Sequence, residues 1–499
     1  MSEQISQQQL ESYLWGAANL LRGVIDPGEY KSIIFPLMFF KRLSDVYDEE
    51  YEDALKESGG DKDYASFPEQ HEFQIPKGCH WSDIREVTKD VGRTIKNAMD
   101  GIEKINGEKL SGIFGDTNWT NKDRLTDATL NNLIEHFSSL NLSIKNVPQD
   151  EFGTAYEFLI KKFADDSGHT AAEFYTNRTV VRVMTLILDP KSGESIYDPT
   201  CGSGGMLLNS ALLVKEKGQE YRNLKLYGQE INLITSGIAK MNMFIHGFDD
   251  FHIVRGDTLK NPAFRENDKL MKFDIVIANP PYSISKWNQE AWKHDAWGRN
   301  KYGVPPKGNA DYAFFQHIIC SMKDKTGRFG ILYPHGILER DAEQKMRAQI
   351  VEDDVIECVV GLGKDLFYNS SMESCLVFGR TKKDHSRKGK IIFIDAKDLI
   401  TRKQTQSFLD EEHIKQIHEA YKNFKDVEGF AKVVDNEEVK NNNYNLNIKL
   451  YVKNNRHINL DILETPLKTY LKNWKESSEE LAKSTKEMNK VLKEVVNGK

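Results

Sequence analysis

Apolar positions recur three and four residues apart through the first part of the chain, which is the period of a helix with one buried face. This pattern predicts helices over residues 13–25, 30–51 and 131–142, with glycine-rich turns between helical segments. Pro36 lies inside the second of these segments, where it would kink the helix or mark its first turn. We therefore predict a separate N-terminal helical domain over residues 1–150.

From about residue 165 to 395, short runs of β-branched and apolar residues alternate with longer helical segments. Alternation of this kind predicts βαβ units around a parallel sheet. The candidate strands are residues 195–197, 224–227, 252–255, 273–278, 329–333, 356–360, 375–378 and 391–394. The predicted fold is α/β and doubly wound, in a domain that spans residues 151–400.

After about residue 400 the chain becomes polar and helical. From Leu460 onward, apolar residues follow a spacing of three and four, which is interrupted at Ser477 and Ser484. The apolar residues are Leu463, Leu467, Tyr470, Trp474, Leu481, Met488, Val491 and Val495. A sustained period of 3.5 residues predicts a long C-terminal helix that packs along another helix. That second helix can belong to a partner or to this chain. We predict that residues 401–499 form a C-terminal helical region for subunit contact.

Composition places the chain among ordinary globular proteins. Of its 499 residues, 29% are charged and 39% are hydrophobic, and the length exceeds that of one compact domain. The N-terminus lacks the apolar stretch of a signal peptide, and the longest apolar run, residues 33–40, is far shorter than the roughly 20 residues of a membrane span. We expect a cytoplasmic protein without a membrane segment.

Charge and cysteine content limit the chemistry further. A net charge of -7 argues against a chain that holds a DNA duplex by itself, because such proteins usually present a basic face to several phosphates. The five cysteines include no C-x-x-C pair, so the sequence indicates neither a disulfide framework nor a zinc site. We expect buried thiols and no metal.

The first predicted strand ends in an acidic residue and a glycine-rich loop, which an apolar helix follows. The loop supplies Asp198, Gly202, Ser203, Gly204 and Gly205. Glycines beyond a strand end let the backbone approach a ligand closely. The loop lacks the G-x-G-x-x-G spacing of a dinucleotide site, and the sequence lacks the G-x-x-x-x-G-K-[ST] motif of an NTP phosphate site. A ligand without phosphates is therefore favoured. S-adenosylmethionine fits this description.

Three acids follow three consecutive predicted strands, namely Asp198, Glu230 and Asp257. We expect Glu230 to accept the ribose hydroxyls, as an acid in this place does for NAD. Asp257 would then face the adenine, and Asp198 the methionine end. Each acid alone could be a helix cap or a turn residue. Their order after one glycine loop favours a cofactor site.

The strand predicted over residues 273–278 runs directly into Asn279, Pro280, Pro281 and Tyr282. An exocyclic amine on adenine is a poor nucleophile because its lone pair is delocalised into the ring. Two acceptors for its two hydrogens favour a pyramidal nitrogen, which stabilises mainly the transition state. The Asn279 side-chain oxygen and the Pro280 carbonyl can be these acceptors.

The remaining residues of this loop support the same chemistry. Tandem prolines fix φ and hold the carbonyl rigidly, and Tyr282 would stack on a base turned out of the helix. The tripeptide alone is a common turn. Its place after an apolar strand, downstream of the cofactor loop, favours catalysis.

Residues 286–307 carry five lysines or arginines against two acids. Among them stand the aromatic residues Trp287, Trp292, Trp297 and Tyr302. Basic and aromatic residues mixed in this way suit a nucleic-acid backbone and exposed bases. A solvated loop that becomes ordered on binding is the alternative.

In combination, these motifs resemble the modification subunits of type I restriction-modification systems, a family of N6-adenine DNA methyltransferases. The likeness is carried by residues 173–178, 198–205, 228–232, 256–259, 279–282, 333–338 and 361–367, and more weakly by residues 14–15 and 40–45. It implies a Rossmann-like S-adenosylmethionine-dependent methyltransferase fold that acts on a flipped-out adenine in double-stranded DNA.

The resemblance also implies a second group of cofactor contacts, on the methionine carboxylate side. These residues are Glu173, Phe174, Tyr175, Thr176, Asn177 and Arg178. Asn177 departs from the family pattern, because proline commonly stands there. Without the proline ring, the sequence does not show what keeps that loop rigid.

About 100 residues follow the last predicted strand, too few for a target-recognition domain beside the long helix, and an ATPase loop is missing from the sequence. The resemblance accordingly implies a specificity subunit that chooses the DNA site, with two copies of this chain for each specificity subunit. A restriction or translocase subunit can join them. We predict that the long helix packs on helices of the specificity subunit.

Two other functions compete with this prediction. Methyltransferases that act on an rRNA guanine or on a release-factor glutamine use similar Asn-Pro-Pro-Tyr loops. The family-specific N-terminal segment and the lack of an evident RNA-binding module argue against them. A catalytically silent assembly protein is the third possibility, and the intact loop and three acids argue against it.

Overall fold

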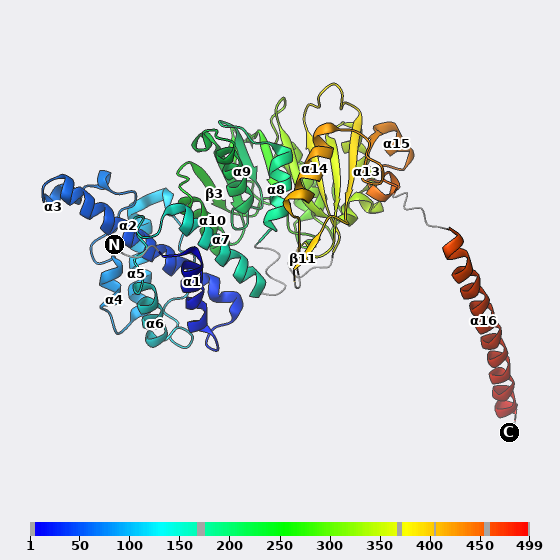
Figure 1. The fold of residues 1–499 in the computed structure, drawn as a ribbon, viewed down its shortest axis with the longest axis horizontal. Helices are drawn as coiled ribbons and strands as arrows, with labels where there is room; N and C mark the ends of the chain where they lie inside the picture. The colour runs from blue at the N-terminus through cyan, green and yellow to red at the C-terminus, as the bar shows by residue number, and fades with distance from the viewer. Residues whose placement is uncertain (1–4, 167–174, 367–371, 404–405, 454–459, 498–499) are drawn as a thin grey trace.

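The computed structural model describes residues 5–166, 175–366, 372–403, 406–453 and 460–497. A helical N-terminal part lies beside a sheet flanked by helices, and α16 (Leu460–Asn497) leads away from both (Figure 1). Among the described helices, none is long and apolar enough to cross a membrane.

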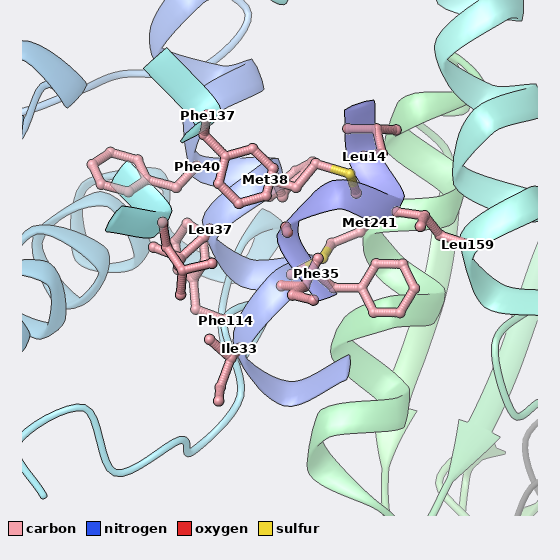
Figure 2. Packing of buried hydrophobic residues seen from close by; sticks show 14 of the residues in the cluster. Leu14, Ile33, Phe35, Leu37, Met38, Phe40, Phe114, Phe137, Leu159 and Met241 are labelled. Atoms are coloured by element: carbon pink, nitrogen blue, oxygen red, sulfur yellow. The ribbon is translucent and has the colours of Figure 1, made fainter. Parts of the chain in front are cut away.

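The N-terminal part is built from helices around one apolar core (Figure 2). Its main helices are α1 (Gln7–Leu21), α2 (Tyr30–Glu57), α5 (Val91–Asn106), α6 (Asp127–Ser138) and α7 (Gln149–Asp166), with short helices α3 (Lys62–Ala65) and α4 (Trp81–Arg85). The three helices predicted from periodicity are confirmed. Pro36 lies within α2, beyond the first turn.

The N-terminal core also includes α10 (Leu233–Ile245), which belongs to the sheet part of the chain. Met241 of α10 lies near Phe35 of α2 in this cluster (Figure 2). The loop before α6 rests on α10 so closely that a Cβ at Gly237 would lie 2.4 Å from the carbonyl oxygen of Ile113. Lys240 donates a hydrogen bond to the Ser111 carbonyl at 2.6 Å. The helical part therefore supports the helix that begins just after Glu230.

A buried charged cluster ties α2 to the segment that leads into α7. Arg42 donates to the carbonyl oxygens of Leu142 and, at 2.9 Å, Val147. Asp45 accepts from the Leu142 N–H at 2.6 Å and from Lys41. Residues 40–45, which match the family only weakly, thus join α2 to the segment before α7. Their buried charges are tolerated because each of them is paired or hydrogen-bonded.

One mixed sheet forms the other part, in the order β13-β10-β8-β9-β7-β6-β1-β2-β3. Its strands are β1 (Ser195–Asp198), β2 (Lys225–Glu230), β3 (Phe251–Arg255), β6 (Ile275–Ala278), β7 (Arg328–Pro334), β8 (Ile356–Leu362), β9 (Ser374–Arg380), β10 (Lys390–Ala396) and β13 (Ala431–Asp435). All eight predicted strands are confirmed.

The expectation of a parallel sheet is wrong in one region. Strands β7, β6, β1, β2 and β3 run parallel, whereas β9 lies antiparallel between β7 and β8, and β13 pairs antiparallel with β10. Strand β13 lies beyond residue 400, where the sequence pattern predicted helices. The parallel region nevertheless brings the ends of β6, β1, β2 and β3 to one edge.

Helices cover both faces of this sheet. On β6, Ile275 and Ile277 join one apolar cluster while Val276 and Ala278 join another, as alternation along a strand requires. The first cluster includes α8 (Arg178–Leu188), α9 (Gly205–Glu216) and α14 (Glu411–Asn423), and the second includes α12 (Asp311–Cys320), α13 (Gln344–Glu352) and α15 (Asn436–Asn441). The fold is a three-layer Rossmann-like domain.

Smaller elements lie in the connections. They are α11 (Gln289–Trp292) and the two hairpins β4 (Arg265–Glu266) with β5 (Lys269–Leu270), and β11 (Thr401–Lys403) with β12 (Gln406–Phe408).

The C-terminal helix α16 confirms the predicted long helix. Its side chains are described for residues 469–489, and all of these are exposed. The exposed fractions of the large apolar residues among them are 72% for Tyr470, 52% for Leu471, 67% for Trp474, 69% for Leu481 and 58% for Met488. An apolar stripe of this kind on a solvated helix indicates a surface for a partner.

Candidate cofactor and catalytic site

The site residues predicted after the strands meet at one edge of the sheet. Asp198 and Glu230 are the last residues of β1 and β2, Asp257 follows β3 by two residues, and Asn279 directly follows β6. Because β6, β1, β2 and β3 are adjacent and parallel, their carboxyl ends lie side by side. In open α/β sheets this edge is where ligands bind.

Asp198 is 2% exposed and accepts a hydrogen bond from the Thr200 N–H at 2.9 Å. Burial, together with the nearby charge of Glu230, raises the pKa of the Asp198 carboxyl to about 8. The loop that follows reaches α9 through Gly202 and Gly204, whose φ angles of 52° and 78° are left-handed. Glycine suits both positions because it carries no Cβ.

Glu230 joins the glycine loop to the end of β2. Its two carboxylate oxygens accept from the Gly202 N–H at 3.1 Å and from the Asn232 N–H at 2.8 Å. The next residue, Ile231, is 62% exposed beside it. An exposed isoleucine at this edge offers an apolar surface for a flat ring, and the predicted cofactor contacts did not include it.

Asp257 holds a turn after β3. One of its oxygens accepts from the N–H groups of Leu259 and Lys260, at 3.0 and 3.1 Å. The Thr258 hydroxyl donates to the Pro199 carbonyl at 2.6 Å, which fixes this turn against the glycine loop. The three acids therefore belong to one connected group of loops.

Of the residues predicted on the methionine carboxylate side, Glu173 and Phe174 lie outside the described residues. Arg178 lies over the Tyr175 ring, 4.4 Å from its centre, and its Nε donates to Glu157 at 2.7 Å. A Cβ at Gly205 would lie 2.0 Å from the Arg178 guanidinium. Arg178 thus packs on the first turn of α9. Burial raises the pKa of Glu157, but the charge and hydrogen bond of Arg178, together with His246 and a hydrogen bond from Asn242, lower the pKa below its usual value.

Asn177, where the family commonly has proline, is fixed by hydrogen bonds. Its side-chain oxygen accepts from the Thr179 N–H at 3.0 Å and caps α8. Its side-chain nitrogen donates to the carbonyls of Ser407 and Leu366, at 3.1 and 3.3 Å. Hydrogen bonds to two distant segments take the place of a proline ring in holding this loop.

The candidate catalytic loop, residues 279–282, contacts the same group of loops. The Asn279 side-chain nitrogen donates to the Thr176 hydroxyl at 3.0 Å, so a residue predicted for the cofactor touches one predicted for catalysis. The Tyr282 hydroxyl donates to the Asn279 side-chain oxygen. Pro280 is buried and Pro281 is half-buried. Burial raises the pKa of Tyr282, so its hydroxyl remains a donor.

The aromatic residues of segment 286–307 do not form an open surface for bases. Trp287, Trp292 and Tyr302 are each at most 4% exposed, and Arg299 is 1% exposed. Arg299 lies over the rings of Trp292 and Trp297 and pairs with Asp295 at 2.6 Å. Three of the four predicted rings are therefore not available to bases in this structure, because Trp287 and Trp292 pack with each other and with α12 and Tyr302 lies in a second apolar cluster, whereas Trp297 is half-buried. Four lysines of this segment remain exposed, namely Lys286, Lys293, Lys301 and Lys307.

Arg299 has a structural role that its sequence context did not reveal. It donates to the carbonyls of Thr258 and Leu259 at 2.9 and 2.7 Å, and so clamps the turn that holds Asp257. Gln229 supports the far side of this turn, with bonds of 3.0 Å to the Asn261 carbonyl and the Ala263 N–H. A charged residue in a polar segment gives no signal of burial, which explains why Arg299 was missed.

Two known protein families match this chain. Residues 147–459 match the N-6 DNA Methylase family, and residues 10–137 match the HsdM N-terminal domain. The first of these matches covers the sheet, both groups of candidate site residues and the catalytic loop.

Individual relatives match over most of their length. The type I restriction enzyme MjaVIII methylase subunit of Methanocaldococcus jannaschii is 33% identical over 482 residues, which cover 90% of this chain and 79% of the relative. The HindI methylase subunit of Haemophilus influenzae is 31% identical over 411 residues, covering 76% of this chain and 89% of the relative.

A solved structure supports the same assignment. The crystal structure of a type I restriction-modification system methyltransferase subunit from Streptococcus thermophilus superposes with a TM-score of 0.77 at 28% identity, over 90% of this chain and all of that one. The resemblance inferred from the motifs is confirmed. This chain therefore belongs to the N-6 DNA methylase family, as the methylase subunit of a type I restriction enzyme.

Proposed function

We propose that this DNA adenine N6-methyltransferase binds S-adenosylmethionine against Asp198, Glu230 and Asp257, and that Asn279 and Pro280 hold the target amine beside it. One observation carries the proposal: these residues stand at the carboxyl ends of four adjacent parallel strands. Cofactor and target base would therefore meet at one edge of the sheet.

The chemistry of the residues present fits S-adenosylmethionine. The buried carboxyl of Asp198 suits the positively charged methionine end, and Glu230 offers two acceptor oxygens to the ribose diol. Ile231 provides an exposed apolar surface for the adenine ring, and Asp257 provides an acceptor for its amino group. The glycines permit close approach of the backbone. When bound, the cofactor supplies a methyl group already activated on a sulfonium.

The Asn279 side-chain oxygen and the Pro280 carbonyl bind the amine of the target adenine. Its two N–H groups donate to the Asn279 side-chain oxygen and to the Pro280 carbonyl, which favours a pyramidal nitrogen with a localised lone pair. Pro280 and Pro281 fix the backbone, and the Thr176 hydroxyl fixes the amide of Asn279. The arrangement stabilises the transition state more than the ground state, which is the requirement for catalysis.

Tyr282 contacts the ring of the target base and not its amine. We propose that its ring stacks on the flipped adenine, which contributes about 1–3 kcal/mol and helps to offset the unstacking of the base from the duplex. Its hydroxyl moves away from Asn279 when the target amine takes over that acceptor.

A partner subunit selects the DNA sequence that is methylated. We propose that α16 packs on helices of a specificity subunit through its apolar stripe, with two copies of this chain for each specificity subunit. The exposed Tyr470, Trp474, Leu481 and Met488 support this proposal, as does the net charge of -7. A restriction or translocase subunit can bind to the same assembly.

Labelled cofactor tests the acceptor directly. The chain, with and without its specificity subunit, is incubated with methyl-labelled S-adenosylmethionine and with DNA, rRNA or release factor. The proposal predicts label on adenine N6 of DNA, and only in the presence of the specificity subunit. Label that appears only on an rRNA guanine or a release-factor glutamine contradicts it.

A further inference from the structure

The geometry points to Asp311 as a positioning residue for methyl transfer, which holds the end of the catalytic loop so that Asn279 and Pro280 face the target amine. This inference rests on the proposed function of that loop. Asp311 lies on α12, outside every motif that led to the site, and its carboxylate reaches the residue that directly follows Tyr282.

The contact is a buried hydrogen bond between a carboxylate and the backbone. One oxygen of Asp311 accepts from the Ser283 N–H at 3.0 Å, and the side chain is fully buried. Ser283 has a left-handed φ of 53°, which a non-glycine residue adopts only when its surroundings hold it there. The hydrogen bond to Asp311 is one such constraint.

Asp311 is itself held from three directions. Its second oxygen accepts from Arg340 at 2.7 Å, and Arg340 also pairs with Glu343 at 2.7 Å. The Asp311 N–H donates to the side chain of Asn309 at 2.9 Å, and the Asp311 carbonyl accepts from the Tyr333 hydroxyl at 2.8 Å. A carboxylate fixed in this way keeps the position of its hydrogen-bond partner, because any movement would leave a buried charge unpaired.

The two ends of the catalytic loop are therefore fixed by different means. At its start, β6 is paired with β7 up to Ala278, directly before Asn279. At its end, the Ser283 N–H is bound to Asp311. Only four residues lie between these anchors, so a shift of Ser283 moves the Pro280 carbonyl relative to the amine. A misplacement of about 1 Å at a reacting group can lower a rate by about 100-fold.

Asp311→Ala and Asp311→Asn, in the complex with the specificity subunit, separate positioning from stability. The substrates are labelled S-adenosylmethionine and unmethylated genomic DNA. We expect Asp311→Ala to lower kcat by about 10- to 100-fold with an unchanged Kd for S-adenosylmethionine. Asp311→Asn keeps an acceptor oxygen for the Ser283 N–H and should lose only about 2- to 10-fold, although it removes the charge that faces Arg340.

Glu357 provides the matched control. Its side chain is equally buried, at 1% exposure, and pairs with Arg380 and Arg387. Glu357 lies on β8, which strands β9 and β7 separate from the loop's anchor strand β6. Glu357→Ala and Glu357→Gln should lower the melting temperature and leave kcat unchanged. A kcat for Asp311→Ala within twofold of that for Glu357→Ala overturns the inference, as does an equal loss in Asp311→Ala and Asp311→Asn. If Asp311→Ala does not fold, Asp311→Asn is compared with Glu357→Gln, and equal kcat values overturn the inference.

Asn279→Ala in the same assay distinguishes a failure of the proposed function from a failure of the positioning role of Asp311. If Asn279→Ala still transfers methyl groups, the proposed function of the loop is wrong. If Asn279→Ala is inactive while Asp311→Ala has full activity, only the positioning role is wrong.

Discussion

The hydroxyl of Tyr282 donates a hydrogen bond to the side-chain oxygen of Asn279, and Asn279 in turn donates to the hydroxyl of Thr176 at 3.0 Å. The amide proposed to receive the target amine is thus already engaged at both ends before a base arrives. Entry of the adenine exchanges the Tyr282 hydroxyl for an amine N–H, which replaces one hydrogen bond with another at small net cost.

This relationship predicts that the ring of Tyr282 matters more than its hydroxyl. Tyr282→Phe keeps the stacking surface and should leave kcat/KM for DNA within about fivefold of wild type, because a hydrogen bond between neutral groups contributes only about 1 kcal/mol net. Tyr282→Ala removes a stacking contribution of about 1–3 kcal/mol and should lower kcat/KM by roughly 5- to 150-fold. An equal loss in both variants would show that the hydroxyl is the essential group.

Cofactor binding should depend on pH through Asp198. Burial raises the pKa of this carboxyl to about 8, so it is mainly protonated below that pH in the free protein. A positively charged ligand favours the ionised carboxylate, and binding then releases a proton. Affinity for S-adenosylmethionine should therefore rise by up to about tenfold from pH 6 to pH 7.

Isothermal titration calorimetry in two buffers of different ionisation enthalpy measures the released proton directly. Asp198→Asn cannot ionise and should show weaker binding without this pH dependence. Binding by the wild type that does not change between pH 6 and pH 7 would place Asp198 away from the charged end of the cofactor.

The close contact between Gly205 and Arg178 gives a third prediction. A Cβ at Gly205 would lie 2.0 Å from the guanidinium, so Gly205→Ala forces Arg178 away from the first turn of α9. We expect the Kd for S-adenosylmethionine to rise by about tenfold, because the displaced guanidinium no longer packs beside the glycine loop. Gly308→Ala is the control, because a Cβ at Gly308 meets open space. Equal affinities in the two variants would contradict a cofactor role for the Arg178 segment.

The apolar stripe of α16 predicts a partner surface. Trp474→Glu should weaken binding to the specificity subunit by about 30-fold or more, since a central aromatic contact often contributes about 2 kcal/mol. Lys472→Glu changes the opposite face of the helix and should bind normally. Gel filtration of co-expressed subunits reports the complex, and the Kd for S-adenosylmethionine should be unchanged in both variants. Intact complexes with Trp474→Glu would place the interface elsewhere.

Much of the fold could be predicted because local patterns determine it. The buried strands read as short apolar runs, and the acids after β1, β2 and β3 and the loop after β6 were found from sequence order alone. The direction of β9 could not be predicted, because an apolar run does not reveal whether its strand lies parallel or antiparallel to its neighbours. Strand β13 was missed because it is an edge strand of mixed polarity.

The errors at the site concern residues whose environment depends on distant parts of the chain. Arg299 looked like a surface cation, yet Asp295, two tryptophans and two backbone carbonyls bury it completely. Asp311 gave no signal either, since its partners Ser283 and Arg340 lie 28 and 29 residues away in the sequence. Such networks form only after the sheet has brought their segments together.

The central claim is that Asn279 binds the adenine amine for methyl transfer and does not bind the cofactor. The most direct test compares wild type and Asn279→Ala, each in complex with the specificity subunit, for N6-methyladenine formed in DNA and for the Kd of S-adenosylmethionine. Our account predicts that the variant forms less than about 1% of the wild-type product, in the range seen when one transition-state hydrogen-bonding group is removed, with a Kd within about threefold of wild type. Methylation at a rate near that of the wild type would contradict it.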